Sequence, residues 1–361
     1  MNKNIFTAQC SGYADDALPG LIESYFESES ERLKRAKLIL IKPNLLSAAA
    51  PEKAVTTNPD FIKTVINILK SYTDAELWMG DSPGANFGKY ERVLEVTGIQ
   101  KTADETGVKI VRVESFKPIT KDGFTYSSLA DEPDIILNLA KLKTHSLTGL
   151  TLAVKNLFGL IPGTSKVGYH RDFPVDEELA DRLYKFFALL DSKTMNIIDG
   201  IVGMEGDGPS KGTPVKLGIT AASSDAVGLD ITVTRMIGLK DDFCLTTKAA
   251  LSAGYDPSHI ETPKADIPVI KLPMTKKMYL PPFLKALFAK QVYVKPLVLN
   301  EPCIKCMLCV NSCPVDAITL VDGYPFVNNK KCIECFCCHE VCESDAVGLE
   351  RSWLHKLLVS K

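Results

Sequence analysis

The residues best suited to chemistry are eleven cysteines, nine of which lie between Cys303 and Cys342. Eight of the nine form two C-x2-C-x2-C-x3-C runs, the second starting at Cys332, 29 residues after the first. Such spacing suits a cubane iron–sulfur cluster, because three thiolates from one tight loop grip three irons and a fourth comes from elsewhere. Each run continues into Asp-Ala and an aliphatic residue, which indicates a duplicated unit. Zinc also accepts four thiolates, but usually from two separated CxxC pairs.

Residues 296–351 closely resemble the bacterial-type ferredoxin module with two [4Fe-4S] clusters. The resemblance implies that the fourth cysteine of each run crosses to the other cluster. One cluster would then be held by Cys303, Cys306, Cys309 and Cys342, and the other by Cys332, Cys335, Cys338 and Cys313. Glu343 replaces the usual proline, and Cys337 is an extra cysteine between two ligands. Neither removes a ligand, and the charge of Glu343 is expected to lower a cluster potential slightly.

From about Lys37 to Leu239, short runs rich in β-branched residues alternate with helical patterns. These segments are the predicted strands and helices that would position any site outside the cysteine runs. This alternation predicts an α/β fold with a mainly parallel sheet covered by helices, followed by a small α+β ferredoxin-like domain. Thr57-Asn58-Pro59-Asp60 predicts a helix start, because it supplies a cap, a first-turn proline and an acid facing the dipole. Further strands are expected at 37–44, 75–80, 108–115, 134–140, 195–201 and 215–222, and further helices from about 89 and at 176–190 and 224–238.

This larger part resembles the domain of unknown function numbered 362 over about residues 36–240. The resemblance rests on KPN (42–44), TTNP (56–59), GDSPG (80–84), KLKTH (141–145), TGLTLAVKNLFGLIPG (148–163) and IIDGIVGMEGDGP (197–209). It implies family membership and a frequent fusion to ferredoxin modules, but no reaction.

Polar residues of these segments fall where strands should end, which is where open parallel sheets bind ligands. If the strand from Ile135 continues, a period of two places Lys141, Lys143 and His145 on one face. With Lys42 and Lys155 they would form a cationic pocket for a carboxylate or phosphate, with glycines 203, 206, 208 and 212 permitting close backbone approach. His145 and Lys143 are the candidate catalytic residues, His145 as proton donor. Candidate binding residues are Lys42, Asn44, Asp81, Ser82, Lys141, Lys155 and Asn156. Solvated strand ends and simple turns are the competing interpretation.

Composition and charge exclude several classes of protein. Lys and Arg total 42 against 44 for Asp and Glu, a net charge of −2 that argues against a nucleic-acid coat protein. No apolar window suits a transmembrane segment, and no secretory signal is evident, so we expect a cytoplasmic protein with reduced thiols.

We divide the chain into an α/β domain (1–270), a basic proline-rich connector (271–295), the ferredoxin-type domain (296–351) and a tail (352–361). The connector either contacts a membrane or partner, packs on the large domain, or tethers the acidic module.

The leading hypothesis is an oxygen-sensitive iron–sulfur oxidoreductase. Two [4Fe-4S] clusters would pass electrons to an anionic small-molecule substrate in the α/β domain, served by a low-potential electron donor or acceptor protein. One alternative is a non-catalytic electron carrier or assembly subunit that docks to a partner redox enzyme. Another is an enzyme whose clusters serve only structure or regulation.

Overall fold

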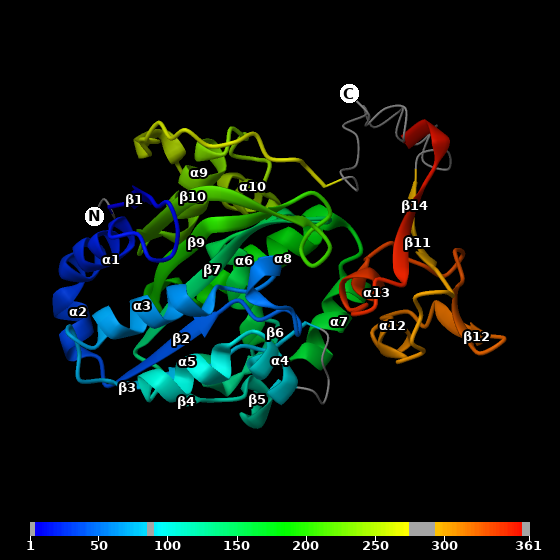
Figure 1. The fold of residues 1–361 in the computed structure, drawn as a ribbon, viewed down its shortest axis with the longest axis horizontal. Coiled ribbons are helices and arrows are strands. Elements are labelled where there is room, and N and C mark those ends of the chain that lie inside the picture. The colour runs from blue at the N-terminus through cyan, green and yellow to red at the C-terminus, as the bar shows by residue number, and fades with distance from the viewer. Residues whose placement is uncertain (1–3, 85–89, 274–292, 356–361) are drawn as a thin grey trace.

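A central sheet organises the larger of two parts seen in Figure 1, in a computed structural model that describes residues 4–84, 90–273 and 293–355. Eight strands form it, in the order β1-β10-β9-β7-β2-β3-β4, with β8 paired to β7. Neighbours from β9 to β4 are parallel, whereas β10 and β1 are antiparallel additions at one edge. The strands are β1 (Phe6–Gln9), β2 (Leu38–Pro43), β3 (Glu76–Met79), β4 (Lys109–Ile110), β7 (Ile135–His145), β8 (Gly149–Thr151), β9 (Thr194–Glu205) and β10 (Thr213–Ser223). The predicted mainly parallel sheet is confirmed.

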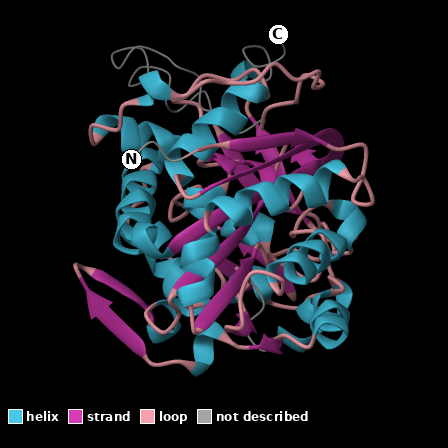
Figure 2. Cartoon of the chain, turned by 90° about the vertical axis from the view of Figure 1, so that its left-hand side faces the viewer, coloured by secondary structure: helices cyan, strands magenta, loops and turns pink. Residues whose placement is uncertain are grey.

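Helices cover both faces of the sheet, as Figure 2 shows from the side. Because alternate strand residues point to opposite faces, Ile39 and Ile41 of β2 enter one core and Leu40 enters the other. The first core is closed by α1 (Ala17–Ser28), α2 (Ser30–Arg35), α3 (Pro59–Leu69), α4 (Tyr90–Val96) and α5 (Ile99–Thr106). The second is closed by α6 (Ala153–Asn156), α8 (Asp176–Leu190), α9 (Ala226–Met236) and α10 (Leu245–Ser252), with the hairpin β5 (Pro118–Lys121) and β6 (Phe124–Ser127) against it.

The predicted helix start is confirmed at α3. The side chain of Asn58 accepts hydrogen bonds from the backbone N–H groups of Asp60 and Phe61 at 2.8 and 3.4 Å, and Pro59 occupies the first helical position. The strand expected over 108–115 is wrong in length. Only Lys109–Ile110 pairs with β3, because the chain then leaves the sheet into a 3₁₀ turn at Val113–Ser115.

Between residues 294 and 351, the smaller C-terminal part contains two antiparallel strand pairs and two short helices. β11 (Val294–Val298) pairs with β14 (Val347–Arg351), and β12 (Ile318–Val321) pairs with β13 (Tyr324–Val327). The helices are α12 (Leu308–Asn311) and α13 (Cys337–Glu340), which occupy equivalent places in the two cysteine runs. This arrangement confirms the small α+β ferredoxin-like domain. We call residues 294–351 the module.

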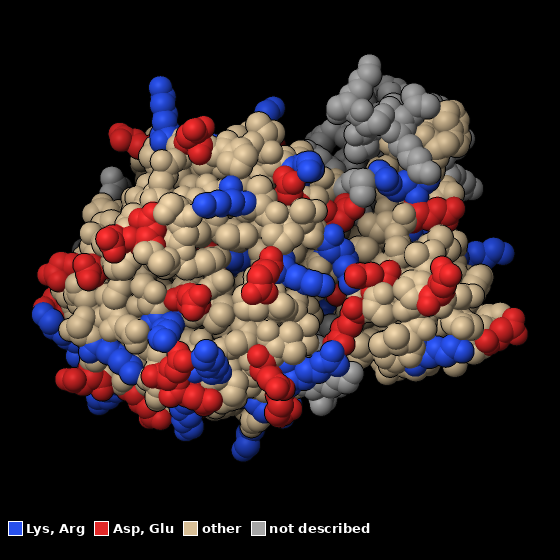
Figure 3. Space-filling view, viewed as in Figure 1, with Lys and Arg blue, Asp and Glu red and all other residues tan. Residues whose placement is uncertain are grey.

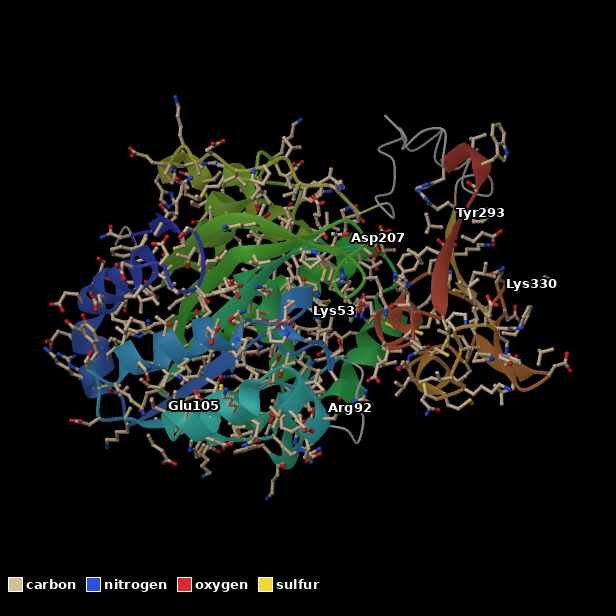
Figure 4. All side chains as sticks on the ribbon, viewed as in Figure 1. Lys53, Arg92, Glu105, Asp207, Tyr293 and Lys330 are labelled. Atoms are coloured by element: carbon tan, nitrogen blue, oxygen red, sulfur yellow. The ribbon has the colours of Figure 1, made fainter. Side chains whose placement is uncertain are left out.

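The module packs directly on the large domain. Phe336 of the module shares an apolar cluster with Leu147 and with Leu179 and Leu183 of α8. Two ion pairs flank this cluster: Arg92 lies 3.5 Å from Glu343, and the Lys211 ammonium contacts Asp345 and the Cys342 carbonyl. Figure 4 shows Arg92 and Asp207 on the side of the large domain toward the module, and Lys330 on the module's outer side.

The predicted domain limits stay a prediction, because most of the connector (274–292) and of the tail (356–361) lies outside the described residues. Ile260 and Ile270 are buried in the core of the large domain, and β11 begins at Val294, near the predicted start of the module. Within the described part of the chain, no helix is both long and apolar enough to cross a membrane.

Candidate functional site

The two cysteine loops share an unusual backbone. Lys305 and Met307 in the first loop have positive φ values of 55° and 64°, and Glu334 and Phe336 in the second have 57° and 58°. A left-handed conformation costs an L-residue roughly 1–2 kcal/mol, so its repetition at matching positions requires compensation. Backbone that alternates between right- and left-handed residues turns successive N–H groups to one side and creates an anion-binding concavity. An anionic iron–sulfur cluster is the kind of group that such loops enclose.

The thiols of the two cysteine runs lie close enough to influence one another. Burial and then the charges of Cys342, Cys306 and Cys303 raise the pKa of Cys309 to about 11. Burial likewise raises the pKa of Cys332, and the Cys335 and Cys313 thiolates add to this increase. Cysteines of one run therefore lie near cysteines of the other, and the division into two ligand sets stays a prediction.

Backbone N–H groups also point at the cysteine sulfurs. The Ala317 N–H donates to Cys313 Sγ at 3.1 Å, and the Ala346 N–H donates to Cys342 Sγ at 3.2 Å, at matching positions of the repeat. Such bonds favour the anionic, metal-bound thiolate and are one determinant of cluster potential. Among the described residues, no three Cys, His, Asp or Glu side chains converge on a single metal ion. A cubane cluster is larger than one ion and fills the space between its ligands, so the grouping fits a cluster.

The two departures from the ferredoxin pattern both face the large domain. The Glu343 carboxylate is paired with Arg92, which offsets part of the charge expected to lower a cluster potential. Cys337, the extra cysteine, is buried at the start of α13 and lies beside both the cysteine loops and a cavity between the domains. Both residues therefore serve the interface between the module and the large domain.

This interdomain cavity has a volume of about 100 Å³. The large domain contributes Lys143 and His145 from the end of β7, Lys155 and Asn156 from α6, and Lys166 and His170 from α7 (Gly163–Asp172). The module contributes Ser312, Cys337 and Glu340. Asn44, Asp81 and Ser82, which follow β2 and β3, complete the polar lining. Cationic residues of one domain thus face the cysteine-bearing helix of the other across a small, partly open space.

Lys143 is held at the cavity wall by the loop after β2. Its ammonium donates to Asn44 Oδ1 at 2.8 Å and to the Val55 carbonyl at 2.6 Å. Burial and the nearby charge of Lys155 lower the pKa of Lys143 to about 7, although Glu340 and Asp81 oppose this decrease. Lys143 can therefore exchange a proton near neutral pH while its position stays fixed.

His145 has a defined tautomer. Its Nδ1 accepts hydrogen bonds from the Leu147 and Thr148 N–H groups at 3.1 and 3.4 Å. The ring proton of neutral His145 therefore resides on Nε2, which lies 3.9 Å from Glu340 Oε1. Burial and then Lys155, His170 and Lys143 lower the pKa of His145 well below its ordinary value. The residue is thus placed as a neutral N–H donor rather than as an imidazolium acid.

Two further lining groups lack partners among the described residues. Ser312 is 1% exposed, and its hydroxyl has no hydrogen-bond partner there. Within the described part of the chain, no hydrogen bond or ion pair involves the Lys155 ammonium, whose pKa is lowered by burial against the opposing effect of Glu340. Buried polar groups of this kind are normally satisfied, so a ligand with acceptor atoms would complete the site.

Lys42 and Lys141 lie outside the cavity, each in a buried ion pair. Lys42 lies 2.7 Å from Asp81, and Lys141 lies 2.7 Å from Asp199 and 3.1 Å from the Tyr13 hydroxyl. The expected common face of Lys141, Lys143 and His145 is interrupted, because the register of β7 against β9 shifts between Lys141 and Lys143. The Lys42 side chain lies on the opposite face of the sheet from that of Ile41. Its ion pair holds the carboxylate of Asp81, which follows β3. Neither ammonium faces the cavity, and a role in binding for either would be indirect.

Sequence reasoning missed Lys166 and His170, the module residues Ser312 and Glu340, and a support beneath Lys155. The carboxylate of Asp230 in α9 accepts from the Ala153 and Val154 N–H groups at 2.8 and 3.0 Å, which caps the short helix carrying Lys155. Gly208, expected to approach a ligand, instead packs against the chain: a methyl group there would lie 2.0 Å from the Thr144 carbonyl oxygen. The Asp230 cap could not be predicted, because a carboxylate that accepts from N–H groups of a different element leaves no local pattern in the sequence.

Comparisons with known proteins identify both parts. The family described as "Domain of unknown function (DUF362)" matches residues 39–235, and the "4Fe-4S dicluster domain" matches residues 295–343. A thylakoid-associated protein of Synechocystis sp. (strain PCC 6803) is 31% identical over 233 residues, which cover 63% of this chain and 72% of that protein. A crystal structure of a Thermotoga maritima protein is 12% identical with a TM-score of 0.34, over 58% of this chain and 56% of that one. That structural likeness is too low to support a conclusion.

Proposed function

The chain belongs to the DUF362 family and carries a 4Fe-4S dicluster domain, and from this premise we propose that it passes electrons from two [4Fe-4S] clusters to a small anion bound between its domains. The proposed ligands are Cys303, Cys306, Cys309 and Cys342 for one cluster and Cys332, Cys335, Cys338 and Cys313 for the other. When bound, such clusters supply single electrons, commonly at low potential. The observation that carries the proposal is the shared cavity, because Lys143, His145 and Lys155 face Cys337, the neighbour of a proposed ligand.

The size of the cavity limits the ligand. About 100 Å³ holds a ligand of only a few non-hydrogen atoms, whereas sites for drug-sized molecules span roughly 300–1,000 Å³. Three lysines line this space, so the ligand class that fits is a short carboxylate or another small oxyanion. Nucleotides and long-chain acids exceed this volume and could enter it only in part.

Eight lining residues of the large domain have a proposed task. Lys155 and Lys166 would balance the charge of the anion, and the His145 Nε2–H would hydrogen-bond to an acceptor oxygen. Reduction of an organic substrate adds protons as well as electrons, and Lys143 would supply one, because its pKa of about 7 makes it an acid at physiological pH. Asn44 would keep the Lys143 ammonium in place, and Asp81, Ser82 and Asn156 would shape the wall.

The non-catalytic alternative places the same clusters in an electron carrier or assembly subunit. It predicts normal cluster reduction and no small anion in the cavity. The name of the Synechocystis relative associates that protein with thylakoids, and a cytoplasmic location for this chain stays a prediction, which cell fractionation tests.

Anion affinity is expected to fall as pH rises through about 7. Below that pH, Lys143 is protonated and attracts a carboxylate, and above it the charge is lost. Lys166, whose pKa is lowered to about 8 chiefly by burial, loses its charge next. We expect acetate or glycolate to bind about tenfold more weakly at pH 9 than at pH 6, which corresponds to about 1.4 kcal/mol. Anaerobic isothermal titration calorimetry measures the affinity.

Lys155→Met should weaken this binding about tenfold at pH 6, because it removes an ammonium that has no other partner in the described structure. Lys53→Met is the matched control, since Lys53 is exposed and does not line the cavity. Absence of acetate, glycolate and phosphate binding in the unmodified protein would contradict the cavity proposal. Equal affinity in Lys155→Met and the unmodified protein would do the same.

A further inference from the structure

The end of the second cysteine run is held by two cations of the large domain. Arg92 of α4 lies 3.5 Å from the Glu343 carboxylate. The Lys211 ammonium, from the loop between β9 and β10, contacts the Asp345 carboxylate and the carbonyl oxygen of Cys342, a proposed cluster ligand. Figure 3 shows basic and acidic side chains next to one another along the boundary between the two parts of the molecule. The surroundings of this ligand therefore come from both domains.

The first cysteine run provides an internal comparison. Cys313 and Asp316 match Cys342 and Asp345 in the repeat. Both aspartates have positive φ values, 49° and 57°, and in each run the N–H of the next residue donates to the cysteine sulfur. Asp345 is paired with a lysine of the other domain, whereas Asp316 is exposed and has no ion pair within the described part of the chain. The two units thus share a backbone and differ in what holds it.

The second run also carries one more acid beside its last cysteine. Glu343 stands where the first run has Pro314, and its side chain is 18% exposed. A poorly solvated negative charge disfavours the electron that a cluster gains on reduction, so Glu343 alone would lower the potential of a cluster held by Cys342. The Lys211 side chain is also 18% exposed, whereas its partner Asp345 is 68% exposed. Solvent therefore screens the acid of this pair better than the ammonium, which leaves a net positive charge next to the ligand.

The loop that carries Lys211 is anchored to the wall of the interdomain cavity. Ser146, which follows His145, donates to the Gly208 carbonyl oxygen from its backbone N–H at 3.1 Å and from its hydroxyl at 2.8 Å. The next residue, Pro209, lines the cavity itself. The loop therefore presents the ammonium to the module from a fixed position, unlike a freely solvated surface lysine.

We propose that Lys211 acts through Cys342 as a positioning residue and raises the reduction potential of the cluster to which Cys342 is assigned. Its charge offsets that of Glu343, and its contact with the Cys342 carbonyl holds the backbone whose Ala346 N–H bonds to the Cys342 sulfur. Because Lys211 belongs to the large domain, this cluster accepts an electron most readily while the module is docked. The inference rests on the proposed function only in that the module carries clusters, and it does not depend on the anion in the cavity.

Anaerobic redox titration of the iron-loaded full-length protein with dithionite, followed by electron paramagnetic resonance of the reduced clusters, tests the inference. Lys211→Met should make reduction of one cluster about tenfold less favourable, a decrease of about 59 mV for one electron, and should leave the other cluster unchanged. Lys211→Arg should keep the original potential, because it retains the charge and the N–H donors. Lys216→Met is the matched control, since Lys216 is exposed on β10, and it should change neither potential.

Lys211→Gln is the second variant in case Lys211→Met loses iron. It removes the charge, keeps a donor for the Cys342 carbonyl, and should lower the same potential. Unchanged potentials in the iron-loaded variants, an equal decrease in Lys216→Met, or an equal decrease for both clusters would overturn the inference. Absence of clusters from the unmodified protein would contradict the proposed function as well, whereas acetate affinity tests the cavity separately.

Discussion

Cys313→Ala is expected to halve the iron and sulfide content of the anaerobically purified protein, from about eight of each per chain to about four. Cys337→Ala, its matched control, should leave both near eight. Cys313 belongs to the first run of cysteines, but the ferredoxin resemblance assigns it to the cluster of Cys332, Cys335 and Cys338, and its charge acts on Cys332 and Cys338. A cubane cluster that loses one of four thiolate ligands is poorly retained, whereas Cys337 is an additional cysteine that the two ligand sets do not use.

Double variants distinguish crossed ligand sets from uncrossed ones. If Cys313 and Cys332 hold the same cluster, Cys313→Ala combined with Cys332→Ala should still contain about four irons. Cys313→Ala combined with Cys309→Ala should then contain almost none. The opposite result, with iron retained in the second pair and lost in the first, would show that each run holds its own cluster. Loss of iron in Cys337→Ala would contradict the assignment of that residue as a spare.

Gly159→Ala is expected to lower the free energy of unfolding by about 1–3 kcal/mol, the usual cost of inserting an extra carbon into a well-packed interior. A methyl group at this position would lie 1.7 Å from Asp81 Oδ1 and 2.6 Å from the Lys42 ammonium. Both partners of the pair are almost fully buried, and the Ser82 N–H also donates to the Gly159 carbonyl at 3.0 Å. The loop therefore cannot move away without disturbing the end of β3 and the cavity wall.

Gly20→Ala is the control for this change. Gly20 lies in α1 with no atom within 4 Å of an added methyl group, so alanine should stabilise the helix by up to about 1 kcal/mol. Denaturant unfolding followed by circular dichroism compares the two variants. Equal stability of Gly159→Ala and the unmodified protein would show that the Lys42–Asp81 pair does not restrict this position.

The 4Fe-4S dicluster domain was predictable because the signal of its cysteines is local. A tight loop brings three thiols together through spacing alone, and the 29-residue repeat identifies the second loop. The cap at Asn58 is equally local, since side chain and N–H groups are two or three residues apart. The lysine-bearing ends of β2 and β7 were predictable from a general property of parallel sheets.

The cavity was only half predictable, because two of its determinants are not local. A register shift directs Lys143 into the cavity and leaves Lys141 with Asp199, and apolar periodicity cannot reveal such a shift. The other determinant is docking of the module, which brings Ser312 and Glu340 opposite Lys155 from almost 160 residues away or more. The sequence pattern predicts polar residues on each domain separately. Which of them face one another across the cavity is decided only when both domains have folded and docked.

The most direct test of the account is anaerobic mixing of the dithionite-reduced, desalted protein with small carboxylates and oxyanions, followed by the visible absorption of its clusters. We predict that at least one anion small enough for the cavity restores the oxidised spectrum rapidly in the unmodified protein, and at least about tenfold more slowly in Lys155→Met. Lys53→Met should match the unmodified protein. If no such anion restores the spectrum, or if Lys155→Met reoxidises at the same rate, electrons do not pass to a ligand held between the domains.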